Sequence, residues 1–105
     1  VPGLGVRAAA VLANIGTHQS QTDLVELASR VTQPLAAREA AAKAFAVNTQ
    51  RYGLLLRRDA IRRQYERYKQ SEGQDEASRQ VFKNILDSIE AKGKEPRTKE
   101  SPGTS

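Results

Sequence analysis

The alanine-rich run at residues 36–45 constrains the fold most, because an earlier stretch repeats its character. The run reads AAREAAAKAF, and residues 4–12 read LGVRAAAVL. We interpret both as helices in which an arginine stands among small apolar residues. A shift of 33 residues superposes their apolar stripes. Because each unit of a helical array buries its apolar face against a neighbour, this pair predicts a helical repeat.

The composition indicates an all-α fold with a core of small side chains. The chain has 105 residues, enough for one domain, with no Trp, Met or Cys and only 5% aromatic residues. Leu, Ile, Val and especially Ala must therefore fill the core, and small side chains let helix axes approach closely. The alternation of β-branched and polar residues that is typical of strands is absent.

Apolar spacing and capping residues predict five helices, at about residues 4–15, 20–31, 34–52, 57–70 and 75–91. Gly16 and Gly53 are placed to end helices, Ser20 and Asp75 to cap them, and Pro34 to begin one. Residues 54–56, three leucines, are either an apolar linker or the start of the fourth helix. Residues 71–74 are interpreted as a turn.

Residues at helical spacing define the predicted inward faces of these helices. They are Leu4, Ala8, Val11, Leu12, Ile15, Leu24, Leu27, Ala28, Val31, Ala37, Ala41, Ala44, Phe45, Val47, Ile61, Tyr65, Tyr68, Val81, Phe82, Ile85, Leu86 and Ile89. From residue 93 onward no large apolar residue occurs. We therefore expect residues 1–92 to form a helical-repeat domain and residues 93–105 a disordered tail or linker.

Residues 4–16, which end in VLANIG, together with AREAAAKAF at 37–45, resemble the HEAT-like repeat of the phycocyanobilin-lyase type. The chain departs from that pattern at its turn, which reads THQS instead of containing Asp-Pro. The resemblance implies stacked antiparallel helix pairs, two hairpins and a closing fifth helix, in a right-handed solenoid. It also implies a scaffold that binds proteins, since most such repeats do so and some handle pigments or nucleic acid.

Several classes of protein are disfavoured by what the chain lacks. Without cysteine there is no disulfide, Cys-based zinc site or catalytic thiol. No apolar stretch approaches the roughly 18 residues of a membrane span, and no signal peptide opens the sequence. We expect a cytoplasmic protein with no membrane partner. Because the chain starts at Val1 and contains no Met, we also expect a fragment or a processed product.

No pattern in the sequence indicates catalysis. His18, Ser20 and Asp23 lie close together, but they occupy a short polar turn where capping and solvation explain them. No carboxylates are grouped with a histidine as a metal centre, and no glycine-rich phosphate loop occurs. We expect no enzymatic activity, no cofactor and no small-molecule substrate.

One segment carries the whole net charge of +5, because residues 51–69 hold seven basic and two acidic residues. The candidate partner-binding residues are Arg51, Arg57, Arg58, Arg62, Arg63, Arg67 and Lys69. They form either a solvated face or a surface for an acidic protein or for nucleic acid. At i, i+4 spacing, Asp59 can pair with Arg63 and Arg62 with Glu66.

These observations lead to a functional expectation. We expect a non-enzymatic protein-interaction or scaffolding module of a larger protein. The alternative is a nucleic-acid-binding helical domain that uses the basic helix at residues 57–69. A third hypothesis is an accessory domain of an enzyme whose catalytic site lies elsewhere.

Overall fold

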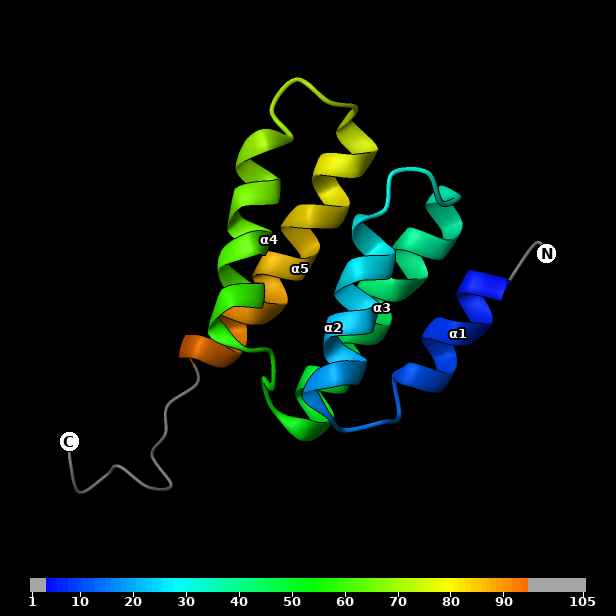
Figure 1. Ribbon diagram of the computed structural model, residues 1–105, viewed down its shortest axis with the longest axis vertical. Coiled ribbons are helices and arrows are strands. Elements are labelled where there is room, and N and C mark those ends of the chain that lie inside the picture. The colour runs from blue at the N-terminus through cyan, green and yellow to red at the C-terminus, as the bar shows by residue number, and fades with distance from the viewer. Residues whose placement is uncertain (1–3, 95–105) are drawn as a thin grey trace.

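A computed structural model describes residues 4–94, and Figure 1 shows that this part of the chain is entirely helical. The five helices are α1 (Leu4–Leu12), α2 (His18–Ser29), α3 (Leu35–Tyr52), α4 (Arg58–Gln70) and α5 (Glu76–Lys94). No strand occurs between residues 4 and 94. The predicted all-α class and the number of helices are confirmed.

α3 is the central helix, and it packs against α1, α2 and α5 (Figure 1). Its alanines make this possible, because Ala37, Ala41 and Ala44 are buried and let the neighbouring helices come close. α4 packs on α5 and not on α3, so the predicted hairpin of the third and fourth helices does not form. The reason is the linker at residues 53–57, which carries the chain away from α3 before α4 begins.

The start of α2 differs from the prediction that Ser20 is its N-cap. Thr17 is the N-cap, and its hydroxyl accepts a hydrogen bond from the Ser20 backbone N–H at 3.0 Å. The Ser20 hydroxyl in turn accepts from the Thr17 N–H at 3.3 Å, which completes a capping box. Gly16 does not cap α1, which ends at Leu12; a Cβ on Gly16 would lie 2.6 Å from the Tyr52 ring.

The other predicted helix ends agree better with the structure. Gly53 follows the last residue of α3 with φ 87°, a conformation that suits glycine. Asp75 precedes α5, and its carboxylate accepts the Ser78 N–H at 2.9 Å. Pro34 is the N-cap of α3, one position before the predicted first turn. α5 extends to Lys94, and the remainder of the predicted tail, 95–105, lies outside the described residues.

The core confirms the predicted face of α5 completely and that of α1 only in part. The α5 residues Val81, Phe82, Ile85, Leu86 and Ile89 are all buried, as predicted. All of them except Phe82 share one core cluster with Phe45 and Ala41 of α3 and Leu24 and Ala28 of α2, which are fully buried.

In α1 the buried residue is Ala9, which is 1% exposed, whereas Val11 is 62% exposed and Ala8 is exposed too. The predicted stripe of this helix is therefore rotated, because its apolar residues are spread around the helix and only α2 and α3 cover it. A shift of 33 pairs the exposed Ala8 with the buried Ala41, so burial does not support that repeat register. The predicted inward residues Ile15, Val31 and Val47 are exposed as well.

Polar side chains are also buried in the core, at positions that the apolar pattern does not predict. Arg38 is only 4% exposed. Its Nε donates to the Ala28 carbonyl and its Nη1 to the Ser78 hydroxyl, each at 2.9 Å. Its guanidinium also lies 5.9 Å from the centre of the Phe82 ring. A buried arginine thus links the end of α2 to the start of α5.

Candidate interaction surface

α4 is the helix that carries most of the positive charge. Its residues are mostly good helix formers, with Asp59 in the first turn and Arg67 and Lys69 in the last. That order suits the helix dipole, which favours anions at the N-terminus and cations at the C-terminus. Ala60 and Gln64 form its buried face, so the arginines project sideways or outward.

Two of the candidate arginines face α2 and are engaged there. The Arg67 Nη2 donates to both Glu26 carboxylate oxygens, at 3.0 and 3.1 Å. The Arg63 Nη1 lies 3.5 Å from the same carboxylate, and its Nη2 lies 3.9 Å from Asp59, the predicted i, i+4 partner. Glu26 and Asp59 therefore offset these charges, and Glu26 holds α4 against α2.

Two further candidates hold the ends of neighbouring helices. The Arg51 Nη1 donates to the Asn14 side-chain oxygen at 2.6 Å. The Arg57 Nη2 lies 3.1 Å from the His18 Nε2 at the start of α2. The positions of both guanidiniums are set by contacts within the domain.

The remaining three candidates, Arg58, Arg62 and Lys69, form what we call the basic stripe. All three are exposed, and none of their side chains makes a hydrogen bond or ion pair with the described part of the chain. Since a helix turns about 100° and rises about 1.5 Å per residue, they lie within about 40° of one another over roughly 17 Å. The predicted pair of Arg62 with Glu66 does not form among the described residues.

Tyr65 lies on the same side of α4 as the basic stripe, between Arg62 and Lys69. It is 41% exposed, so the prediction that it faces the core is wrong. Its hydroxyl donates to the Glu90 carboxylate of α5 at 2.7 Å, which fixes the ring. That hydrogen bond, with partial burial and the charge of Glu90, raises the Tyr65 pKa above 10.0. The ring is therefore a neutral, oriented surface beside three cations.

The polar turn before α2 is organised as a helix start. The Ser20 hydroxyl donates to the carbonyls of Ile15 and Thr17, the latter at 2.9 Å, and not to His18. His18 faces Arg57 instead, and Asp23 accepts from the Gln19 amide at 2.9 Å. The structure thus does not bring the serine, histidine and aspartate into mutual contact.

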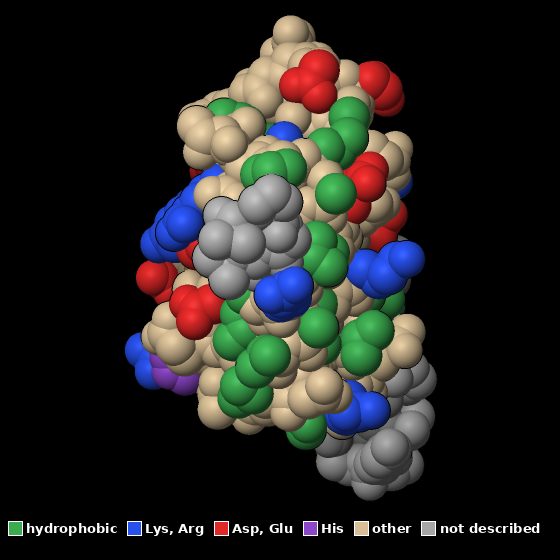
Figure 2. Space-filling model, turned by 90° about the vertical axis from the view of Figure 1, so that its right-hand side faces the viewer, with side chains coloured by type: hydrophobic (Ala, Val, Ile, Leu, Met, Phe, Trp, Pro, Cys, Tyr) green, Lys and Arg blue, Asp and Glu red, His purple; other side chains and the backbone are tan. Residues whose placement is uncertain are grey.

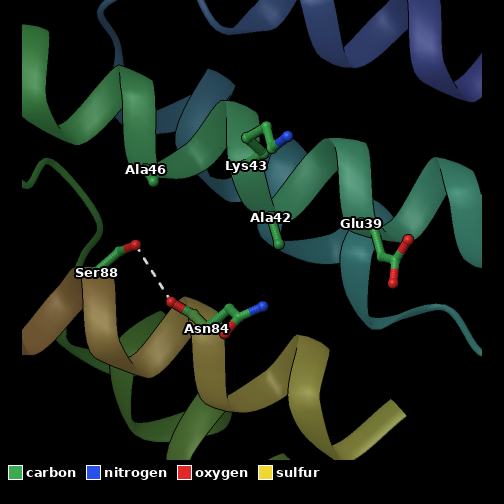
Figure 3. A pocket seen from close by; sticks show the side chains of 6 residues that line it. All are labelled: Glu39, Ala42, Lys43, Ala46, Asn84 and Ser88. Carbon is green, nitrogen blue, oxygen red and sulfur yellow. Dashed lines mark hydrogen bonds between the residues drawn. The ribbon is translucent and has the colours of Figure 1, made fainter. Parts of the chain in front are cut away.

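A shallow hollow of about 400 Å³ lies between α3 and α5 (Figure 3). It is lined by Glu39, Ala42, Lys43, Ala46, Asn84 and Ser88. The Ser88 hydroxyl donates to the Asn84 backbone carbonyl at 3.2 Å, while Lys43 points away from that pair (Figure 3).

Between residues 4 and 94, no group of three or more His, Asp or Glu side chains could hold a metal ion. None of the helices within that range has both the length and the apolar character that crossing a membrane requires.

Sequence reasoning located the basic helix but not which of its cations are accessible. The division depends on Glu26, which lies 41 residues before Arg67 and gives no local signal. The apolar pattern did not identify the buried face of α4, because a polar residue, Gln64, lies on that face and is completely buried. The i, i+4 spacing of Ala60 and Gln64 is the one sequence signal that could have identified that face.

No protein-family model, curated protein or solved structure matches this chain. The resemblance to the HEAT-like repeat therefore stands on the residues that carry it and stays a prediction.

Proposed function

We propose that this chain is a protein-interaction module that binds an acidic segment of a partner protein through the basic stripe and Tyr65. The observation that carries the proposal is the division of the seven cations. Four are held by contacts inside the domain, whereas Arg58, Arg62 and Lys69 stand exposed with no partner among the described residues. Protein interfaces are enriched in tyrosine and arginine, so exposed arginines beside an oriented tyrosine are typical of a binding surface.

The surroundings of the stripe favour a protein over a nucleic acid. Glu66 is exposed on α4 and Glu90 lies against Tyr65, so carboxylates flank the cations. A continuous phosphate backbone would be repelled by these carboxylates, whereas a protein surface can place its own cations opposite them. The rigid support also favours docking, since the Glu26 contacts hold α4 before any partner arrives.

Nucleic acid is the second candidate, and one observation favours it. Tyr65 exposes part of its ring between Arg62 and Lys69, and an exposed aromatic ring among cations can stack on an unpaired base. Single-stranded RNA or DNA is the form that this geometry would accept.

A binding titration separates the two candidates. The probe is a labelled alanine-based helical peptide with three glutamates at the spacing of the stripe, measured by fluorescence anisotropy. A peptide of the same composition, with its glutamates distributed around the helix, is the control for charge alone. Single-stranded RNA and DNA oligonucleotides are titrated in parallel.

The matched protein variants differ only in where three cations are removed. Replacing Arg58, Arg62 and Lys69 with Gln should weaken peptide binding about tenfold or more. The same three-charge loss at Arg7, Arg30 and Lys83, away from the stripe, should change it little. Tighter binding of the oligonucleotide would favour the second candidate, and equal loss in both variants would overturn the stripe as the site.

A further inference from the structure

A second surface of the domain, independent of α4, has the form of a docking groove. It lies between α1 and α3, has a volume of about 230 Å³, and is lined on its apolar sides by Val6, Ala9, Ala10, Ala40, Ala44 and Val47. Figure 2 shows hydrophobic side chains gathered on the side of the molecule where α1 lies.

The groove has a floor of small residues and two larger apolar walls. Ala9 and Ala44 form the floor and are 1% and 8% exposed. Val6 of α1 and Val47 of α3 are 40% and 43% exposed. An alanine floor allows the backbone of an incoming helix to approach closely, while the valines offer apolar area to cover.

The groove is also pre-formed. α1 and α3 approach so closely beside it that a Cβ on Gly5 would lie 2.8 Å from the Ala37 Cβ. The Asn48 amide of α3 donates to the Leu12 carbonyl at the end of α1, which fixes the other end of the pair. Because the two helices need not move, little ordering of the groove opposes the binding of a ligand.

The charge of the groove indicates what its occupant carries. Lys43 is the one charged residue in the lining, and within residues 4–94 it forms no ion pair. Its side chain points away from Asn84 and Ser88 (Figure 3). The only charged residue within α1 is another cation, Arg7, which is exposed. An apolar groove with an unneutralised ammonium is complementary to an apolar surface that bears a carboxylate.

We propose that the α1–α3 groove binds an amphipathic helix of a partner protein, with a Glu or Asp of that helix placed against Lys43. From Ala40 to Val47 the groove follows roughly 10 Å of α3, which corresponds to two turns of an incoming helix. A second copy of this chain fits less well, because a two-fold contact through this face would place Lys43 near Lys43. The proposal does not depend on the basic stripe.

The test uses the full chain and two labelled model peptides. Each is a short amphipathic helix with leucines at i, i+3, i+4 and i+7; one carries glutamates on the flank of the apolar face, and the other lysines. Amide chemical shifts locate the binding site, and anisotropy measures the affinity. The acidic peptide should bind and should shift resonances of Ala10, Ala40 and Val47. Shifts confined to other surfaces would overturn the proposal.

Charge exchange tests the role of Lys43. Lys43→Glu should weaken binding of the acidic peptide about tenfold and strengthen binding of the basic one. Lys83→Glu on α5, a charge reversal of equal size outside the groove, should change neither. If Lys43→Glu leaves the preference unchanged, the assigned contact is wrong.

Polar substitutions of valine test the walls of the groove. Val47→Gln is at an exposed site, so the protein should stay folded, and it should weaken binding of the acidic peptide about fivefold or more. Val11→Gln, equally polar and outside the lining, is the matched control. Sedimentation of both variants detects the competing occupant: a dimer that Val47→Gln dissociates would assign the groove to a second copy and refute the proposal.

The two proposals fail separately. Substitution of Gln for Arg58, Arg62 and Lys69 should leave binding in the α1–α3 groove intact, whereas Val47→Gln should leave binding at the basic stripe intact.

Discussion

The Gln21 amide donates to the Asn48 side-chain oxygen at 2.9 Å, with both residues completely buried between α2 and α3. Gln21 also accepts from the Leu55 N–H and donates to the Gly53 carbonyl, each at 2.8 Å. Asn48 uses its own amide to satisfy carbonyls at the end of α1, including that of Leu12 at 2.9 Å. This pair therefore joins three helices and the linker that leads to α4.

Asn48→Ala should destabilise the fold by about 3 kcal/mol, because an unpaired buried polar group costs about 1–3 kcal/mol and several are left without a partner. Urea unfolding measures the free energy. Asn84→Ala is the control, since Asn84 is exposed on α5 and its loss should cost less than about 0.5 kcal/mol. Equal effects of the two changes would contradict the role of Asn48.

Ala41→Leu should destabilise the fold by about 1–3 kcal/mol, because Ala41 is 0% exposed in the centre of α3 and a larger side chain overpacks the core. Ala36→Leu adds the same atoms at an exposed site of that helix and should be nearly neutral. The comparison is a thermal melt of both variants. A melting temperature of Ala41→Leu equal to that of the wild type would mean that the packing around α3 is looser than described.

The helices were predictable because each is bounded by local signals. Gly53 at positive φ and Asp75 at an N-terminus act through hydrogen bonds within a few residues of themselves. The face of α5 was equally clear, since five large apolar residues share one stripe. In α1 apolar residues occur all around the helix, so the pattern could not distinguish Ala9 from Val11.

The segment that carries the cations was predictable from the sequence, but which of these cations are accessible was not. Arg67 and Lys69 look alike in the sequence, yet Arg67 contacts Glu26 of α2 while Lys69 faces outward. Such a difference arises from tertiary contacts and has no local counterpart. The α1–α3 groove is likewise invisible in the sequence, because it exists only where Val6 and Val47 come to opposite sides of an alanine floor.

Gly53→Ala should cost about 1–3 kcal/mol of unfolding free energy through backbone strain alone. At φ 87° and ψ 175°, Gly53 occupies a region that residues with a Cβ avoid, although nothing lies within 4 Å of the added atom. Denaturant titration gives the loss. Gln50→Ala, one turn earlier and exposed, should be within about 0.5 kcal/mol of the wild type. A neutral Gly53→Ala would show that the linker can adopt another conformation.

Asp75→Ala should reduce stability at neutral pH but not in acid. The Ser78 backbone N–H, followed by the Ser78 side chain, lowers the Asp75 pKa below its ordinary value of 3.8, and Arg38 adds to the effect. A lowered pKa means that the folded state favours the carboxylate, so its contribution is complete above pH 3.8 and disappears as the pH falls through the folded value.

Unfolding measured across an acid series checks this prediction. The difference between the wild type and Asp75→Ala should shrink as the pH falls below 3.8. Asp75→Asn keeps an acceptor for the Ser78 N–H without a titrating group, so its difference from Asp75→Ala should not depend on pH. If the difference in unfolding free energy between the wild type and Asp75→Ala stays constant through the acid range, the charge of Asp75 does not have this role.

The number of accessible cations predicts the salt dependence of nucleic-acid binding, should the second candidate function hold. If all seven candidate residues reached phosphates of a single-stranded oligonucleotide, the slope of log affinity against log salt would be about −4.9, at about 0.7 per phosphate. Three cations on the basic stripe predict a slope of about −2.1. Anisotropy between about 50 and 200 mM salt distinguishes these values.

Substitution of single residues then tests the division of the seven cations into three accessible residues and four that are held inside the domain. Arg62→Gln should flatten the slope by about 0.7 and weaken binding to every sequence alike, because no base-reading group accompanies it. Arg67→Gln removes the same charge from a residue held by Glu26 and should leave the slope unchanged. If both variants flatten the slope equally, the contact of Arg67 with Glu26 opens on binding and the stripe has more than three members. If the protein shows no binding to RNA or DNA at about 50 mM salt, where such contacts are strongest, nucleic acid is eliminated and the acidic protein partner is the remaining occupant.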